Sequence, residues 1–170
     1  MIACICEGGA EKTIIEILLN ADRLNFTRDD LLEGELINER SSKKFEKKYL
    51  SKSFSEEIDV YLILDSHSEK FKLSKQYRDK VNVYKFITSP EIEMLVIIKE
   101  GRYDDFNKKK SKTKPSTYCK EVLKFKNVKT RDFVKEYFSD VDELVKCIQT
   151  YKSKSKDFKK GEKYLADLIK

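Results

Sequence analysis

The chain has 170 residues and a net charge of +6, and hydrophobic and charged residues each make up 39% of it. This length and composition predict one globular domain with a real hydrophobic core, and five glycines and two prolines leave little room for long flexible linkers. No apolar run approaches the roughly 20 residues of a membrane-spanning helix, and the start "MIACICEGG" lacks the basic segment of a signal peptide, so we expect a cytoplasmic protein.

The first predicted elements are a strand and a helix. Residues 2–6 form a short apolar run typical of a buried strand, and residues 10–21 carry apolar side chains at helical spacing. Thr27 can cap the turn that follows it, whose acidic residues suit the start of a helix. The polar residues 41–53 predict a helix or a loop over the edge of the sheet.

Two further strands follow, at residues 58–64 ("IDVYLIL") and 81–87 ("VNVYKFI"). A helix is predicted from Pro90 to about Lys99, with proline at its first position. Short buried strands that alternate with helices indicate an α/β fold with a parallel, Rossmann-like sheet, although no fourth strand is evident. Helical patterns recur at residues 116–126, 131–138, 140–151 and 158–169.

The cysteines give no metal-binding or disulfide pattern. Cys4 and Cys6 share one face of the first strand, whereas Cys119 and Cys147 lie on predicted helices. The sequence has no C-x-x-C pair and only one histidine, which does not match the ligand spacing of a structural zinc site. We therefore expect four buried, reduced and unreactive cysteines, which agrees with a cytoplasmic setting.

Carboxylates follow the first two strands directly. Glu7 comes after the first strand and Asp65 after the second, and sites in parallel sheets form at the carboxyl ends of the strands. Glu11, one helical turn after Glu7, can reach the same crevice. Converging carboxylates need a cation, and oxygen ligands suit Mg²⁺ or Mn²⁺. The alternatives are ordinary: an acid that favours the start of a helix, and a turn residue at Asp65.

The same residues carry a family resemblance. The stretches "ICEGGAE" and "YLILDSHSE" resemble the TOPRIM fold, the metal-binding catalytic domain of topoisomerases, bacterial primases and OLD-family nucleases. "YKFITSPEIEMLVII", at residues 84–98, is similar to a segment of the stand-alone RloB-like group. The resemblance implies a TOPRIM-like α/β domain at residues 1–130, with a C-terminal helical extension at 131–170 packed on the same domain.

The resemblance also implies roles for single residues. Glu7 corresponds to a metal ligand or general base, Glu11 to a second glutamate, and Asp65 to the first acid of a D-x-D motif. His67 stands where the second acid belongs, and Glu69 could replace that acid. His67 is therefore a Mn²⁺ ligand, a proton shuttle or a plain surface residue.

Glu93 completes the set of candidate acids. It corresponds to a metal-site carboxylate in the resemblance, and its alternative is an ordinary acid in the first turn of a helix. The activity that the resemblance implies is a Mg²⁺- or Mn²⁺-dependent nuclease, with phage defence as one setting.

Positive charge is concentrated in the second part of the chain. Residues 1–100 carry a net charge of −3 and residues 101–170 a net charge of +9, and the stretch 107–131 holds ten basic residues and one acid. Such a segment favours a polyanion, so it predicts contacts with the nucleic-acid backbone, although a solvated lysine-rich face remains the alternative. The candidate contacts are Lys109, Lys110, Lys112, Lys114 and Lys120.

A second function class fits the same observations. The chain could be a non-catalytic module that binds nucleic acid, or that docks on a protein partner or a second copy of itself, with a site degenerate at His67. Aromatic residues among the lysines could stack on unpaired bases, although their helical spacing favours a place in the core. The sequence leaves open whether the nucleic acid is DNA or RNA.

Overall fold

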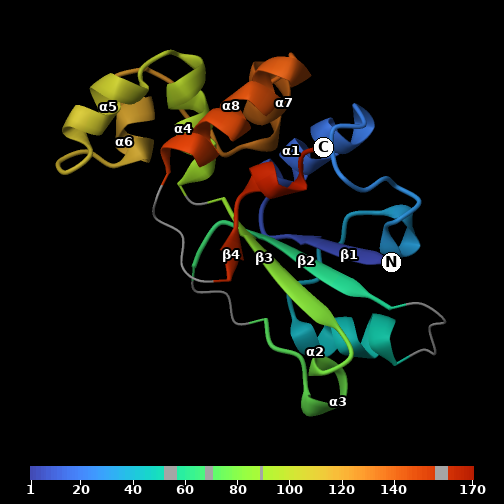
Figure 1. The fold of residues 1–170 in the computed structure, drawn as a ribbon. Coiled ribbons are helices and arrows are strands. Elements are labelled where there is room, and N and C mark those ends of the chain that lie inside the picture. The colour runs from blue at the N-terminus through green and yellow to red at the C-terminus, as the bar shows by residue number, and fades with distance from the viewer. Residues whose placement is uncertain (52–56, 68–70, 89, 156–160) are drawn as a thin grey trace.

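A parallel β-sheet forms the centre of the fold (Figure 1). The structure is a computed structural model, and it describes residues 1–51, 57–67, 71–88, 90–155 and 161–170. The four strands lie in the order β1-β2-β3-β4, and all of them are parallel to their neighbours. Their bounds are Ile2–Cys6 for β1, Asp59–Leu64 for β2, Asn82–Ile87 for β3 and Glu162–Lys163 for β4.

Helices cover both faces of this sheet, so the expected α/β architecture is confirmed (Figure 1). On one face lie α1 (Gly9–Asn20), α4 (Glu91–Lys99), α7 (Arg131–Tyr137) and α8 (Val141–Lys154). The other face is covered by α2 (Ser42–Phe45), a π-helical turn (Glu46–Leu50) and α3 (Lys75–Arg78). Two further helices, α5 (Tyr103–Lys109) and α6 (Pro115–Glu121), pack beyond α4.

Two hydrophobic clusters result from this layering. Because successive side chains of a strand point to opposite faces, Cys4 of β1 packs toward α1 and α4, while Ile5 packs toward α2. Both faces of the central strands are covered, which explains why β1 and β2 are apolar along most of their length. All four cysteines are buried and free, as the sequence predicts.

The register of the strands brings their carboxyl ends to one line. Cys6 pairs with Ile63, and Leu64 pairs with Ile87. The Glu7 amide still donates to the Ile63 carbonyl at 2.9 Å, and the Thr88 amide donates to the Leu64 carbonyl at 2.7 Å. The residues after the strands therefore emerge side by side, which positions the candidate site.

The C-terminal segment differs from its expected form. The sequence pattern predicts a helix over residues 158–169, but the described part contains β4 and a 3₁₀ helix, Leu165–Leu168. Gly161 has a φ of 89°, which helical residues do not adopt, and the Tyr164 amide donates to the Asp167 carboxylate at 2.8 Å to begin the short helix. The segment 131–170 is thus not purely helical, and it supplies an edge strand to the sheet.

Three smaller differences lie in the helical region. Helix α5 has no counterpart among the predicted elements, because its seven residues, "YDDFNKK", carry only two apolar side chains, too few for a periodic pattern. The predicted helix 116–126 ends at Glu121, since Lys124 has a φ of 64°. Pro90 caps α4 rather than occupying its first helical position.

No helix within the described ranges has both the length and the apolar character needed to cross a membrane.

Candidate functional site

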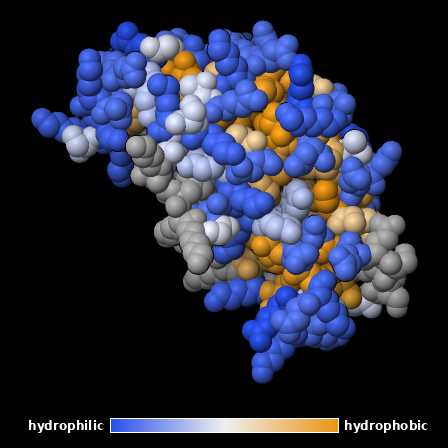
Figure 2. Space-filling model, in the orientation of Figure 1, coloured by the Kyte–Doolittle hydropathy of each residue, from blue (hydrophilic) through white to orange (hydrophobic). Residues whose placement is uncertain are grey.

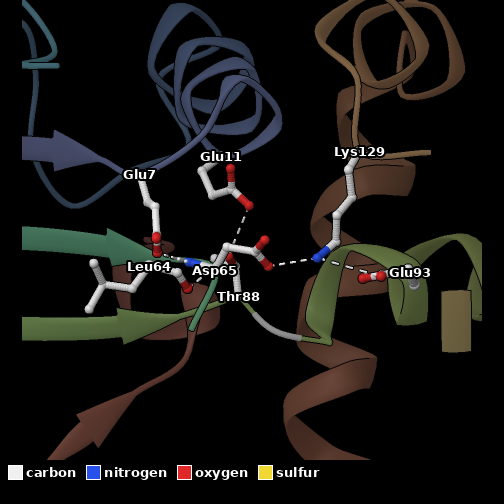
Figure 3. A network of polar contacts seen from close by, with 7 residues as sticks. All are labelled: Glu7, Glu11, Leu64, Asp65, Thr88, Glu93 and Lys129. Carbon is white, nitrogen blue, oxygen red and sulfur yellow. Dashed lines mark hydrogen bonds and ion pairs between the residues drawn. The ribbon is translucent and has the colours of Figure 1, made fainter. Parts of the chain in front are cut away.

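Three carboxylates and one ammonium group meet at the carboxyl edge of the sheet (Figure 3). Glu11 comes from α1, Asp65 follows β2, Glu93 lies in the first turn of α4, and Lys129 comes from the loop before α7. We call these four residues the acidic cluster. Glu7, which the sequence also predicts at this edge, contacts Arg40 and the Asp65 backbone instead of Lys129.

Lys129 lies between two of the acids. Its Nζ is 2.6 Å from Oδ1 of Asp65 and 3.5 Å from Oε1 of Glu93. The other carboxylate oxygen of Glu93 is buried and has no hydrogen-bond partner among the described residues. The ammonium therefore links the end of β2 to the start of α4 but leaves one buried oxygen unsatisfied.

Glu11 is the residue that α1 contributes to the acidic cluster. Its side chain is only 3% exposed, and the Thr88 hydroxyl lies 3.2 Å from Oε1. The same hydroxyl is 3.0 Å from the Leu64 carbonyl, which ties it to the end of β2. A Cβ atom at Gly8 would lie 2.4 Å from Oε2 of Glu11, so glycine leaves the room that this carboxylate occupies.

Glu7 connects the carboxyl ends of β1 and β2 through a hydrogen bond. Its Oε2 accepts a hydrogen bond from the Asp65 backbone amide at 2.7 Å, and its Oε1 forms an ion pair of 2.6 Å with Arg40. The Glu7 carboxylate therefore fixes the backbone of Asp65, while the Asp65 side chain points toward Lys129 (Figure 3). In this arrangement Glu7 positions Asp65.

The pKa values of Glu11, Glu93 and Lys129 are all raised by their surroundings in the fold. Desolvation raises the pKa of Glu11 and of Glu93, and the charge of Asp65 raises both further, although Lys129 opposes this. Burial by itself lowers the pKa of Lys129, but the hydrogen bond to Asp65 and the charges of Glu93, Asp65 and Glu11 outweigh it, so the pKa is raised. The ammonium stays charged, and it contacts two of the three carboxylates, Asp65 and Glu93.

His67, one of the two candidate residues in the D-x-D-like loop, contacts a different part of the sheet from the acidic cluster. Nδ1 of His67 is 3.0 Å from the Glu162 carboxylate, so His67 contacts β4, on the far side of β3 from β1 and β2. The structure thus joins His67 to an acid that the sequence did not connect with it. Glu69 lies outside the described residues.

All five predicted basic contacts are exposed. Lys109 also forms an ion pair of 3.0 Å with Asp105, whereas Lys110, Lys112 and Lys114 have no ion pair described. Hydrophilic side chains dominate the surface over α5 and α6 (Figure 2). Lys120, also exposed, lines a hollow beside the acidic cluster.

The oxygen atoms of the acidic cluster are of the kind that binds a hard cation, but in the structure Asp65 and Glu93 contact the Lys129 ammonium. Carboxylate oxygens are the ligands that Mg²⁺ and Mn²⁺ prefer, and the unsatisfied oxygen of Glu93 is one such donor. Within the described ranges, no three acidic, histidine or cysteine side chains are placed so that they could hold a metal ion as they stand. Lys129 takes the position between Asp65 and Glu93.

Glu91, two residues before Glu93, predicts a pH dependence of stability. Its carboxylate is fully buried, and neither oxygen has a hydrogen-bond partner among the described side chains. Desolvation raises its pKa well above the ordinary value of 4.5, and the backbone amide of Leu165 opposes this only in part. The folded chain therefore holds a proton that the unfolded chain releases, so the free energy of unfolding should fall as the pH rises above about 4.5.

The replacement Glu91→Gln should remove this part of the pH dependence. The slope that one proton contributes is at most about 1.4 kcal/mol per pH unit. Chemical denaturation between about pH 5 and about pH 8 measures it, with Glu136→Gln, at an exposed site on α7, as the matched control. Glu11 and Glu93 act in the same direction in all three proteins, so an equal slope in wild type and Glu91→Gln would contradict the prediction.

Sequence reasoning missed three participants: Arg40, Thr88 and Lys129. Lys129 falls inside the basic stretch, but its partner Asp65 is 64 residues away in the chain, and no spacing connects them. Thr88 directly follows β3, so the rule that placed Glu7 and Asp65 at strand ends could have found it. No signal in the sequence marks Arg40.

Comparison of the chain with protein-family models, curated proteins and solved structures gives no match. The TOPRIM-like identity therefore stays a prediction, while the parallel sheet flanked by helices is consistent with a Rossmann-like fold. Because a fold of this class hosts many activities, a functional assignment must rest on the site itself.

Proposed function

We propose that the chain is a divalent-metal-dependent phosphodiesterase that acts on nucleic acid. The observation that carries the proposal is the acidic cluster: three carboxylates from three segments of the chain lie together at the strand ends, and a single ammonium contacts two of them. Fully ionised, this group carries an excess negative charge that a divalent cation would neutralise. The sequence motifs that resemble TOPRIM proteins support the same proposal.

Glu11, Asp65 and Glu93 are the residues that would hold the cation. When bound, a divalent cation neutralises charge on the phosphate and activates water for attack. Glu7 keeps the Asp65 backbone in place through its 2.7 Å hydrogen bond, and Arg40 holds Glu7 in turn. These contacts limit the freedom of the cluster before any substrate binds, as a preorganised site requires.

Lys129 has two roles in this proposal. Without a cation it forms ion pairs with Asp65 and with one oxygen of Glu93, which offsets part of the repulsion among the three acids. If a cation were held by the acids, the Lys129 ammonium would be free to contact a phosphate oxygen of the substrate, since a lysine ammonium acts as a flexible point charge. The 35% exposure of its side chain leaves it access to solvent and substrate.

The test is a cleavage assay on supercoiled plasmid DNA and on a structured RNA. We expect strand cleavage with Mg²⁺ or Mn²⁺ and none in excess chelator. Cleavage that persists in chelator after repeated purification would point to a contaminating or metal-independent nuclease. Failure of the purified chain to cut either substrate with either cation would overturn catalysis by the isolated protein.

A non-catalytic nucleic-acid-binding module is the second candidate, and one observation favours it. Lys129 already contacts Asp65 and Glu93, so two of the three acids have a positive partner without a metal. The exposed lysines of the segment 107–131 would then supply affinity through phosphate contacts and release of counterions. Nucleic-acid affinity is common to both candidates, so the assay above separates them.

Charge reversal at Lys110, Lys112 and Lys114 should weaken binding to all sequences alike. The slope of log affinity against log salt should fall by about one unit for each phosphate that the variant no longer neutralises. Fluorescence anisotropy with labelled DNA and RNA measures both quantities. The matched control reverses the charge of three lysines on the opposite face, Lys43 and Lys44 of α2 and Lys47 of the π-helical turn. An equal loss of affinity in both variants would mean that net charge alone, and not this surface, determines binding.

A further inference from the structure

A pocket of about 450 Å³ lies beside the acidic cluster and shares two residues with it, Glu93 and Lys129. Its volume is in the range of pockets that hold small ligands. The remaining lining residues come from α6 and from the loop between α6 and α7: Ser116, Lys120, Phe125, Lys126, Asn127 and Val128. A ligand in this pocket would therefore lie next to Glu93 and Lys129, at one side of the acidic cluster.

The lining selects an anion with an apolar part. Three lysines face one glutamate, so the pocket carries a positive charge. Phe125 and Val128 form an apolar wall, and Ser116 and Asn127 offer polar atoms. A second hollow of about 360 Å³ has the opposite character, because three glutamates and one lysine line it. The positive lining is thus a property of this pocket and not of every hollow on the surface.

The loop that forms the wall is held in place. Its backbone takes left-handed conformations at Lys124 and Asn127, with φ of 64° and 58°, and the Phe125 amide donates to the Cys119 carbonyl at 2.9 Å. The Phe125 ring packs edge-on against Phe133 and Tyr137, with centroids 5.7 and 5.3 Å away. The wall is therefore formed before a ligand arrives, which lowers the entropic cost of binding.

We propose that this pocket binds one nucleotide of the substrate, next to the phosphodiester that the acidic cluster acts on. Lys120 and Lys126 contact its phosphate, and the base packs against Phe125, since an aromatic face accepts any base. This inference rests on the proposed function, because it names the part of the substrate that flanks the cleaved bond. It also assigns Lys120, one of the predicted basic contacts, to the phosphate of that nucleotide.

The test measures nucleotide binding in the absence of divalent metal. Calorimetry or amide chemical shifts of Asn127 and Val128 report binding of adenosine monophosphate, adenosine and inorganic phosphate to the wild-type chain. We expect the nucleotide to bind more tightly than either part. Lys126→Gln should weaken nucleotide binding about tenfold, as expected for loss of a hydrogen bond to a charged group. Phe125→Leu should weaken it about fivefold or more through loss of stacking.

The matched control is Lys43→Gln, an exposed lysine of α2 on the other face of the sheet that does not line the pocket. Equal losses of affinity in Lys43→Gln and Lys126→Gln would overturn the pocket, and so would equal affinity for inorganic phosphate and the nucleotide. The comparison of the three ligands uses wild-type protein, so it holds even if Phe125→Leu folds poorly. If the wild type binds no nucleotide but cleaves nucleic acid, the nucleotide-binding proposal is wrong and the proposed function stands. If it binds the nucleotide in the pocket but cleaves nothing, the proposed function falls.

Discussion

Replacing Asp65 with asparagine is expected to reduce metal-dependent cleavage by about 10²–10³-fold, the loss typical when one preorganised electrostatic group is removed from an active site. The amide keeps the size of the side chain and an oxygen that can still accept from Lys129. It removes the negative charge that the cluster would use to hold a cation. The hydrogen bond from the Asp65 backbone to Glu7 does not depend on this side chain, so the fold should be preserved.

The control for this replacement is Asp79→Asn. The Asp79 side chain is 83% exposed and lies after α3, outside the acidic cluster. Rates from single-turnover cleavage with Mg²⁺ and with Mn²⁺ are compared with the thermal midpoint of each variant. Activity of Asp65→Asn within about twofold of the control would show that the acidic cluster is not the catalytic centre.

The second large effect is expected from Lys129→Met. This replacement should lower the stability of the metal-free protein, and added metal should offset that loss. Without metal the change removes the only cation described in contact with Asp65 and Glu93, and three buried or half-buried carboxylates then repel one another. Breaking a fully buried ion pair costs about 3–5 kcal/mol. Because the Lys129 side chain is 35% exposed, we expect the free energy of unfolding to fall by about 1–2 kcal/mol.

Added Mg²⁺ or Mn²⁺ should reverse this loss of stability. A ligand at about 100 times its dissociation constant stabilises the folded state by about 2.7 kcal/mol, and in Lys129→Met the cation does not compete with an ammonium. The thermal midpoint of Lys129→Met should therefore rise with metal more than that of wild type. Lys135→Met, at an exposed position of α7, serves as the control. A Lys129→Met variant that metal does not stabilise would contradict the proposed cation site.

The effect of pH on this variant has a defined direction. The pKa values of Glu11 and Glu93 are already raised by burial, and loss of Lys129 removes a charge that holds both of them down. Folded-state pKa values above those of the unfolded chain make the folded state less stable as the pH rises. The metal-free deficit of Lys129→Met should therefore shrink toward low pH.

The sequence was sufficient for three of the four described strands of the sheet. The strands β1, β2 and β3 were predicted within one residue because buried parallel strands are short, continuous apolar runs that need no knowledge of their neighbours. The same reasoning placed Glu7 and Asp65 at one edge, since the carboxyl ends of parallel strands lie together. The structure brings both residues to that edge, joined by the hydrogen bond from the Asp65 amide to Glu7.

The tertiary structure decided what the sequence could not. Strand β4 has two residues, too few for any periodic pattern, and it exists because the C-terminal segment returns beside β3. His67 finds its partner Glu162 only through that return.

The partners of the acids were decided in the same way. Lys129 reaches Asp65 and Glu93 because the loop before α7 packs over the strand ends, while Arg40 takes one oxygen of Glu7. Local apolar patterns specify strands and helices because they depend on neighbours in the chain. The choice of charged partners depends on distances in space between segments far apart in sequence, and only the packed chain fixes those distances.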